Sequence, residues 1–122
     1  MYNAKLLNHF QYPRNVGHLD GANVEVEVCN PICGDILRLS AYIREDHIDA
    51  IRYLARGCTA SIAVGSALTE ILSGQKVDRL DFVTKRQVEE MVGGLPQESK
   101  HAAVLAIDAV KALRRKVCDE LR

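Results

Sequence analysis

The sequence predicts an α+β fold, in which a small three-stranded antiparallel sheet carries helices packed on one face and the chain ends in a long helix. The prediction rests on order: segments with the two-residue period of strands come first, and segments with the helical period follow. Runs of strands followed by runs of helices are typical of the α+β class. We expect one domain over residues 1–122, long enough to bury a core without disulfides.

Three strands are expected in close succession. Strict alternation of apolar and polar side chains predicts the first two over residues 24–30 and 36–44. A third strand follows over residues 48–56, and its inward face stays open because both faces offer apolar side chains. The turn between the second and third strands falls at residues 45–47. Short turns between consecutive strands predict an antiparallel meander.

A short helix is expected near the N-terminus, over residues 4–10. Asn3 is a suitable N-cap, and Leu6, Leu7 and Phe10 recur on one face of this helix. The helix is ended by the segment YPRNVG at residues 12–17, because proline disfavours a helical conformation in the residue before it.

Three more helices are expected after the sheet. Residues 59–73 are apolar on nearly every side and predict a buried helix that Gly74 ends. Thr84 and Gln87 match a capping box that opens a short helix to about residue 92. Ser99 is expected to cap the final helix, which runs to about residue 121 with an apolar seam at positions 106, 110, 113, 117 and 121.

Charge and hydropathy exclude several broad classes of function. Sixteen basic and sixteen acidic side chains give no net charge, so neither nucleic acid nor an anionic membrane is expected as a partner. No stretch approaches the roughly 18 apolar residues of a membrane span, and the first residues carry no signal-peptide core. Four cysteines in such a chain suggest reduced thiols in a cytoplasmic setting, serving as metal or redox groups.

Cys33, Asp35, Cys58 and His101 are the candidate metal-binding residues. Cys33 and Asp35 flank Gly34 in the loop between the first two strands, and glycine permits the tight turn that lets both serve one ion. Cys58 stands where the third strand meets the buried helix, whose positive end favours a thiolate. His101 falls in the first turn of the last helix. Two thiolates, one carboxylate and one imidazole form a tetrahedral set for Zn²⁺ or a set of soft ligands for iron.

Each of these four residues also has a purely structural interpretation. A single cysteine is most often a small buried apolar residue, but Cys33 and Cys58 both stand beside glycine at the junctions of elements, which favours function. Asp35 alone is equally well explained as a turn residue. His101 alone is more consistent with an exposed side chain at a helix start than with a ligand.

The other cysteines and histidines have simpler interpretations. Cys29 shares a strand face with two glutamates and is either a half-exposed strand residue or an additional thiol near the metal-binding loop. Cys118 lies beside the seam of the last helix and is expected to pack. His9, His18 and His47 are expected to be solvated. No phosphate-binding glycine loop, nucleophile elbow or HExxH motif is present, so we do not expect an enzyme.

Taken together, these motifs resemble the IscU/NifU-type scaffold proteins of iron–sulfur cluster assembly, the NifU N-terminal domain family. The resemblance rests on YPRNVG at residues 12–17, CGD at 33–35, RGC at 56–58 and LP at 95–96 ahead of His101. It implies an α+β fold and cluster ligands at Cys33, Cys58 and a third cysteine, with Asp35 keeping the cluster labile and His101 beside it. It also implies sulfur delivery by a cysteine desulfurase and cluster transfer to apo iron–sulfur proteins.

The sequence departs from this family pattern at two places. In such scaffolds the third cysteine directly follows the histidine, and this position is Ala102 here. The Leu-Pro-Pro-Val-Lys segment read by a dedicated Hsp70-type chaperone is replaced by LPQES at residues 95–99, which argues against that chaperone as a partner. Because alanine offers no ligand, we expect iron, a labile [2Fe–2S] cluster or zinc, held by Cys33, Asp35, Cys58 and His101.

Three functional hypotheses follow for this variant. The first is an iron–sulfur scaffold or carrier that transfers its cargo to apo-proteins. The second is a degenerate metal-binding adaptor that regulates a cysteine desulfurase without building clusters. In the third, Cys29 stands in for the missing thiol as a ligand or as the acceptor of sulfur.

Overall fold

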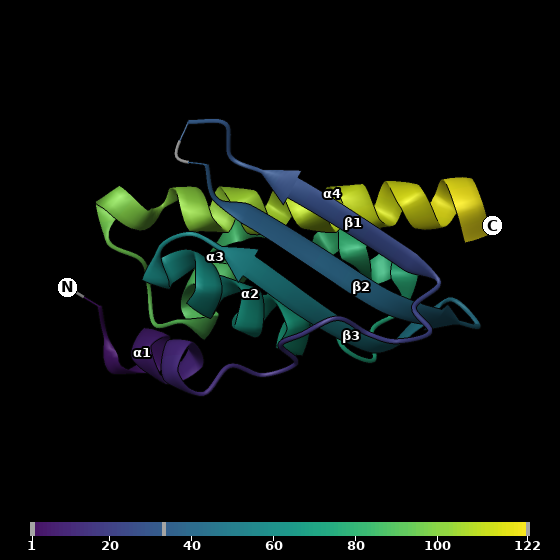
Figure 1. Cartoon of the computed structure of the whole chain (residues 1–122), viewed down its shortest axis with the longest axis horizontal. Coiled ribbons are helices and arrows are strands. Elements are labelled where there is room, and N and C mark those ends of the chain that lie inside the picture. Colours follow the sequence, from purple (N-terminus) through teal and green to yellow (C-terminus); the bar gives the residue numbers. More distant parts are fainter. Residues whose placement is uncertain (1, 33, 122) are drawn as a thin grey trace.

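The computed structural model describes residues 2–32 and 34–121 and contains a three-stranded antiparallel sheet with helices on one face (Figure 1). The strands follow one another in the order β1-β2-β3, as a meander. They are β1 (Val24–Cys29), β2 (Ile36–Arg44) and β3 (His47–Arg56). The helices are α1 (Ala4–Gln11), α2 (Thr59–Leu72), α3 (Lys85–Met91) and α4 (His101–Leu121), with short 3-10 helices η1 (Val77–Phe82) and η2 (Gln97–Ser99). The predicted α+β fold is confirmed.

The core lies between the sheet and the two long helices. Helix α4 packs behind β1 and β2, and α2 packs behind β3 (Figure 1). The alternation in the first two strands directs one set of side chains inward. The buried members of that set are Val24, Val26, Leu37, Leu39, Ala41 and Ile43. Complete burial of one such branched side chain contributes roughly 1.5–3 kcal/mol, so this face supplies much of the driving force for folding.

A β-bulge changes which face of β3 points inward near the start of the strand. Tyr42 pairs with Ala50, but the next residue, Ile43, pairs with Ile48, so β3 contains one extra residue at this point. As a result Ile48 and Ile51 are both buried, although their spacing is not that of a regular strand.

Helix α1 begins at the predicted cap but buries a different face from the one expected. The Oδ1 atom of Asn3 accepts a hydrogen bond from the Leu6 N–H at 3.0 Å. The buried residues of α1 are Leu6 and His9, whereas Leu7 and Phe10 stay more than one third exposed. The expected apolar face was therefore right for Leu6 and wrong for Leu7 and Phe10, because the polar residue His9 is buried beside Leu6 instead.

His9 is buried, so its predicted solvation is wrong. Its Nδ1 atom lies 2.8 Å from Ser66 Oγ of α2, and the same Oγ accepts a hydrogen bond from the Arg14 N–H at 2.9 Å. The Ser66 hydroxyl can then donate its own hydrogen bond to Nδ1, which requires that Nδ1 carry no proton and so fits a neutral imidazole. Burial and the charge of Arg14 lower the pKa of His9, and they outweigh the nearby Glu70, which raises it.

The YPRNVG segment at residues 12–17 protects the free edge of the sheet. The Tyr53 N–H of β3 donates to the Asn15 carbonyl at 2.9 Å, and the Gly17 N–H donates to the Tyr53 carbonyl at 2.8 Å. An unpaired strand edge is a template for pairing with other chains. This segment thus ties α1 to β3 and leaves less of that edge open.

The C-terminal half matches the predicted helices but adds η1 and η2, and it departs from the prediction at one cap, at Cys118 and at Leu121, a predicted seam residue that is 38% exposed. The capping box of Thr84 and Gln87 is present at α3. Ser99 is the last residue of η2, so its predicted role as the N-cap of α4 is wrong. The seam of α4 is buried as far as Val117, whereas Cys118 is exposed, against the expectation that it packs.

None of the helices that the structure describes is long and apolar enough to cross a membrane.

Candidate metal centre

Asp35, Cys58 and His101 meet at one end of the sheet. Asp35 immediately precedes β2, Cys58 lies between β3 and α2, and His101 is the first residue of α4. Their potential ligand atoms all lie within 4.8 Å of one another. Three segments that are distant in the sequence therefore converge on one point. The fourth predicted residue, Cys33, lies outside the described residues.

One carboxylate oxygen, Oδ2 of Asp35, is the common contact of this group. Ser61 Oγ donates a hydrogen bond to it at 2.5 Å, His101 Nε2 lies 3.2 Å from it, and the Cys58 thiol donates to it at 3.6 Å. Cys58 Sγ also lies 3.6 Å from His101 Nε2. A sulfur, a nitrogen and an oxygen that face one small volume form a donor set that suits Zn²⁺ or iron.

Asp35 is buried, with 5% of its surface exposed, and it is nevertheless ionised at neutral pH. Burial raises the pKa of Asp35, but hydrogen bonds from Ser61, Cys58 and His101, together with the charge of His101, lower it by more. The pKa therefore lies below its ordinary value of 3.8. A cation can bind this carboxylate without first displacing its proton.

Two glycines position the carboxylate, one through its backbone conformation and one through the space that its missing Cβ leaves. Gly34 has φ +76°, the left-handed conformation that a tight turn before Asp35 requires. At Gly57, with φ +150°, a Cβ atom would lie 2.4 Å from Asp35 Cγ and 2.5 Å from its Oδ1. Side chains do not approach this closely, so only glycine lets Asp35 pack against the end of β3.

Cys58 is the N-cap residue of α2, and its side chain makes no capping hydrogen bond. Its sulfur is therefore not engaged by the helix backbone, and it sits at the positive end of a 14-residue helix. Ser61 was not anticipated from the sequence. A signal was available, because residues three apart in a helix lie on the same face, and Cys58 and Ser61 have this spacing.

Cys29 points away from this centre. It is exposed at the end of β1, on the face of the sheet opposite α2 and α4, and it pairs in register with Ile36. Within the part of the chain that the structure describes, the metal-binding group contains Asp35, Cys58 and His101 but not Cys29. The prediction of a half-exposed strand residue is thus closer to the structure than that of an additional ligand.

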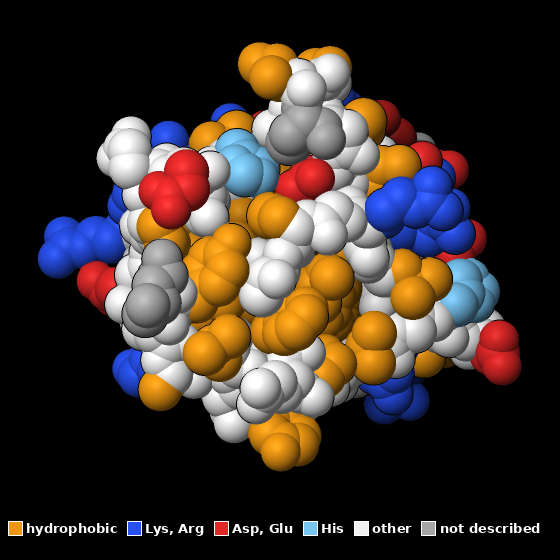
Figure 2. Space-filling model, turned by 60° about the vertical axis from the view of Figure 1, so that its left-hand side comes forward, with side chains coloured by type: hydrophobic (Ala, Val, Ile, Leu, Met, Phe, Trp, Pro, Cys, Tyr) orange, Lys and Arg blue, Asp and Glu red, His pale blue; other side chains and the backbone are white. Residues whose placement is uncertain are grey.

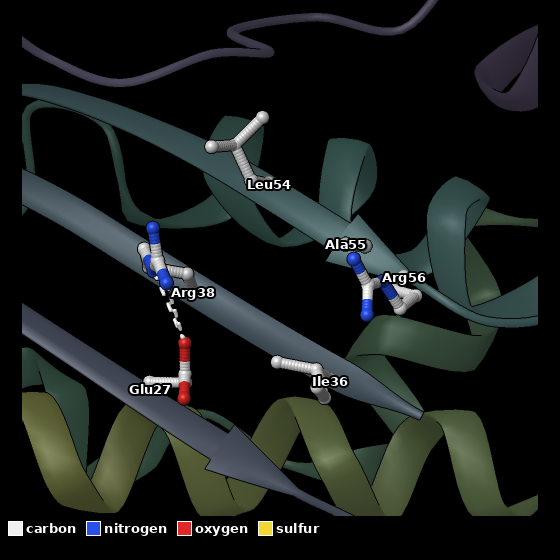
Figure 3. Close-up of a pocket in the computed structure, with 6 residues that line it drawn as sticks. All are labelled: Glu27, Ile36, Arg38, Leu54, Ala55 and Arg56. Atoms are coloured by element: carbon white, nitrogen blue, oxygen red, sulfur yellow. Dashed lines mark hydrogen bonds and ion pairs between the residues drawn. The ribbon is translucent and has the colours of Figure 1, made fainter. Parts of the chain in front are cut away.

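The same outer face of the sheet carries a hollow of about 330 Å³ (Figure 3). Its lining residues are Glu27, Ile36, Arg38, Leu54, Ala55 and Arg56. Arg38 donates to Glu27 at 2.8 Å across two strands, as Figure 3 shows. Asp35, the chain neighbour of Ile36, is instead buried against α2 and α4, so the hollow and the candidate metal centre are separate features.

Hydrophobic side chains gather on the end of the molecule that carries α1 and the start of α4. Figure 2 shows them as a nearly continuous central area, with charged side chains mostly around it. At the loop before β2, Ile32 is 96% exposed beside the CGD motif. Exposed apolar areas of this kind are typical of surfaces that contact other proteins.

Comparison with known proteins places the chain in a family. The family model described as NifU-like N terminal domain matches residues 1–116. The iron-sulfur cluster assembly scaffold protein IscU 1 of Archaeoglobus fulgidus is 38% identical over 122 residues, which cover 100% of this chain and 78% of that protein. IscU of Escherichia coli is 32% identical over 115 residues, covering 91% and 89% of the two chains.

A solved structure agrees with this assignment at the level of the fold. The crystal structure of the N-terminal part of a nitrogen-fixing NifU-like protein from Brucella abortus matches with a TM-score of 0.78, covering 97% of this chain and 94% of that one, at 16% identity. From the match of the family model and the identity to the IscU proteins, the chain belongs to the NifU-like N-terminal domain family.

Proposed function

We propose that this protein is an iron–sulfur cluster assembly scaffold or carrier, which binds iron or a labile cluster and transfers it to apo-proteins. The observation that carries the proposal is the convergence of Asp35, Cys58 and His101 in a chain of this family. The matched IscU relatives are named as assembly scaffold proteins, which supports a binding role rather than an enzymatic one.

The proposed ligands of this cargo are Cys33, Asp35, Cys58 and His101. The last three supply one oxygen, one sulfur and one nitrogen within a 4.8 Å span. Cys33 would add a second thiolate from its place two residues before Asp35 in the sequence. A [2Fe–2S] cluster takes four protein ligands, usually thiolates with histidine as a known substitute, so a set in which a carboxylate oxygen takes one place would hold it more weakly. The same four groups also suit a single Zn²⁺ ion.

The proposed partners are a cysteine desulfurase, which supplies sulfur, and the apo iron–sulfur proteins that receive the cargo. The apolar area in Figure 2 supports protein–protein contacts of this kind. An Hsp70-type chaperone is not included, because residues 95–99 lack the second proline and the lysine of the expected segment. A cytoplasmic setting is proposed, since the chemistry needs reduced thiols.

Anaerobic reconstitution tests the proposal directly. The protein is incubated with ferrous iron, a cysteine desulfurase with cysteine, and a thiol reductant that converts persulfide sulfur to sulfide, and its visible absorption and bound iron per chain are measured. We expect charge-transfer absorption and stoichiometric iron in the wild type, and a loss of both in Cys58→Ser and His101→Gln. The exposed Cys118 and the partly buried His47 both lie outside the metal-binding group and provide matched controls, as Cys118→Ser and His47→Gln. A wild-type protein that binds no iron and shows no absorption would refute the scaffold function.

A second candidate function is favoured by Ala102. This residue occupies the position of the third family cysteine, carries no donor atom and is only 1% exposed. The protein would then be an adaptor that binds zinc and regulates a cysteine desulfurase without receiving sulfur. Intact-mass analysis after incubation with desulfurase and cysteine distinguishes the two functions. A mass increase of one sulfur supports the scaffold, and unchanged mass with retained zinc and retained binding to the desulfurase supports the adaptor.

A further inference from the structure

We propose that Ser61 is a positioning residue of the metal centre, whose hydroxyl group holds the Asp35 carboxylate in the orientation that binds the ion. This inference rests on the proposed ion-binding function of Asp35, Cys58 and His101. It assigns a role to a buried side chain that is not itself a ligand in the proposed set.

Among the hydrogen-bond partners of the Asp35 carboxylate in the described residues, Ser61 lies closest. The separation of Ser61 Oγ and Asp35 Oδ2 is 2.5 Å, compared with 3.2 Å for His101 Nε2 and 3.6 Å for Cys58 Sγ. Both partners are buried, with Ser61 3% and Asp35 5% exposed. A hydroxyl–carboxylate bond of this length falls at the short end of the roughly 2.5–2.7 Å range of charge-assisted bonds, which are about twice as strong as neutral ones.

The three contacts of Oδ2 respond differently to an incoming ion. Cys58 and His101 contact the carboxylate through the sulfur and nitrogen atoms that would ligate the ion, so bonds to the ion would replace these two contacts. The Ser61 hydroxyl keeps its proton and its bond to Oδ2. It is then the donor that remains in the set to restrict rotation of the carboxylate.

The position of Ser61 in α2 explains why its hydroxyl is available. Three residues after the N-cap Cys58, it lies on the same face of the first helical turn, with Oγ 3.4 Å from the Cys58 sulfur. Ser61 therefore contacts two of the proposed ligands and connects the start of β2 to the start of α2. Outer-shell hydrogen bonds of this type typically change metal affinity by about 10–100-fold.

Zinc affinity, measured by competition with a chromophoric chelator at fixed pH, tests this role. We expect Ser61→Ala to bind Zn²⁺ about 10–100-fold more weakly than the wild type. Ser40→Ala is the matched control, because Ser40 is another buried serine, 2% exposed, and its hydroxyl accepts a hydrogen bond from the Leu19 N–H at 2.9 Å, outside the metal-binding group. The control should bind zinc as the wild type does.

A double-mutant cycle with Asp35→Ala separates positioning from general loosening of the structure. If Ser61 acts through Asp35, Ser61→Ala weakens zinc binding in the wild-type background and causes no further loss in the Asp35→Ala background. Absorption of bound Co²⁺ gives a second readout, and its ligand-field bands should change in Ser61→Ala but not in Ser40→Ala.

Three results would overturn the proposal, and they can be told apart. Wild-type affinity in Ser61→Ala shows that the hydroxyl does not position the carboxylate. Equal losses from Ser61→Ala in both backgrounds show that the serine acts on the fold and not through Asp35. An Asp35→Ala variant with unchanged zinc affinity removes the proposed ion site itself, and the role of Ser61 with it.

Discussion

Gly57 provides the sharpest test of how the metal centre is built, because one added methyl group collides with the proposed ligand. In Gly57→Ala the new Cβ would lie 2.4 Å from Asp35 Cγ, 2.5 Å from Oδ1 and 2.9 Å from Oδ2. Ordinary contacts begin at 3.4 Å, so the carboxylate must retreat by about 1 Å. Functional constellations tolerate displacements of only about 0.5 Å, so the carboxylate can no longer share one ion with Cys58 and His101.

The stability cost has two separable parts. Alanine at φ +150° is strained, which costs of order 1–3 kcal/mol at any position with such a backbone. Displacing the buried Asp35 also weakens its hydrogen bonds, and bonds to a charged group contribute about 1.5–3 kcal/mol. Gly17 allows the first part to be measured alone, because it has φ +126° and a Cβ there meets nothing within 4 Å.

The assay compares Gly57→Ala with Gly17→Ala in urea unfolding and in zinc competition. We expect both variants to be destabilised and Gly57→Ala to lose about 1.5–3 kcal/mol more than the control. Only Gly57→Ala should lose zinc affinity, by at least about 10-fold. Wild-type zinc affinity in Gly57→Ala, or equal behaviour of the two variants, would refute the reasoning.

Three further predictions concern the pH dependence, the cysteines and the first helix. Lowering the pH below 6.5 should reduce the free energy of unfolding, because the pKa of His9 is lower in the folded protein and the unfolded chain takes up the proton first. Urea denaturation at about pH 7.5 and about pH 5.5 should show this decrease, and His9→Gln should lessen it. Cys29→Ser should leave zinc affinity unchanged, whereas Cys58→Ser should abolish it, and a loss in Cys29→Ser would restore Cys29 as a ligand. Asn3→Ala should lower the free energy of unfolding by about 1 kcal/mol in urea, and an unchanged value would show that the Leu6 N–H gains nothing from its cap.

Much of the fold could be predicted from period and capping chemistry alone. Residues 36–44 alternate without interruption, and the strand there has the predicted bounds. The errors arise where polar groups take part in packing or where the period breaks. His9 reads as a polar surface residue until Ser66 of α2 is placed beside it, and that contact spans 57 residues of sequence. The bulge in β3 likewise depends on its pairing with β2 and leaves no local signal.

Three residues of the candidate site, which the structure brings together, could be selected from the sequence, whereas the way the site is built could not, and Cys33 stays a prediction. The residue types and their places at the ends of elements were sufficient to select Asp35, Cys58 and His101 as candidates. Two features needed the three-dimensional arrangement. Gly57 is required because its missing Cβ leaves space for the carboxylate of the residue that precedes β2, and Ser61 matters because its hydroxyl meets that same carboxylate.

The donor set of the proposed site bears on what cargo it can hold. Iron–sulfur clusters are held mainly by thiolates, whereas carboxylate and imidazole groups suit single ions such as Zn²⁺ and Fe²⁺. With Ala102 in place of a third thiol, oxygen and nitrogen donors make up half of the proposed four ligands. In this proposed set Asp35 is a full ligand of the ion, because Cys33, Cys58 and His101 supply only three of the four donors. Its low pKa and its bond from Ser61 suit this task, since both keep an ionised and oriented oxygen available. A set of this kind favours capture of a single ion first, with any cluster held loosely enough to leave for an acceptor.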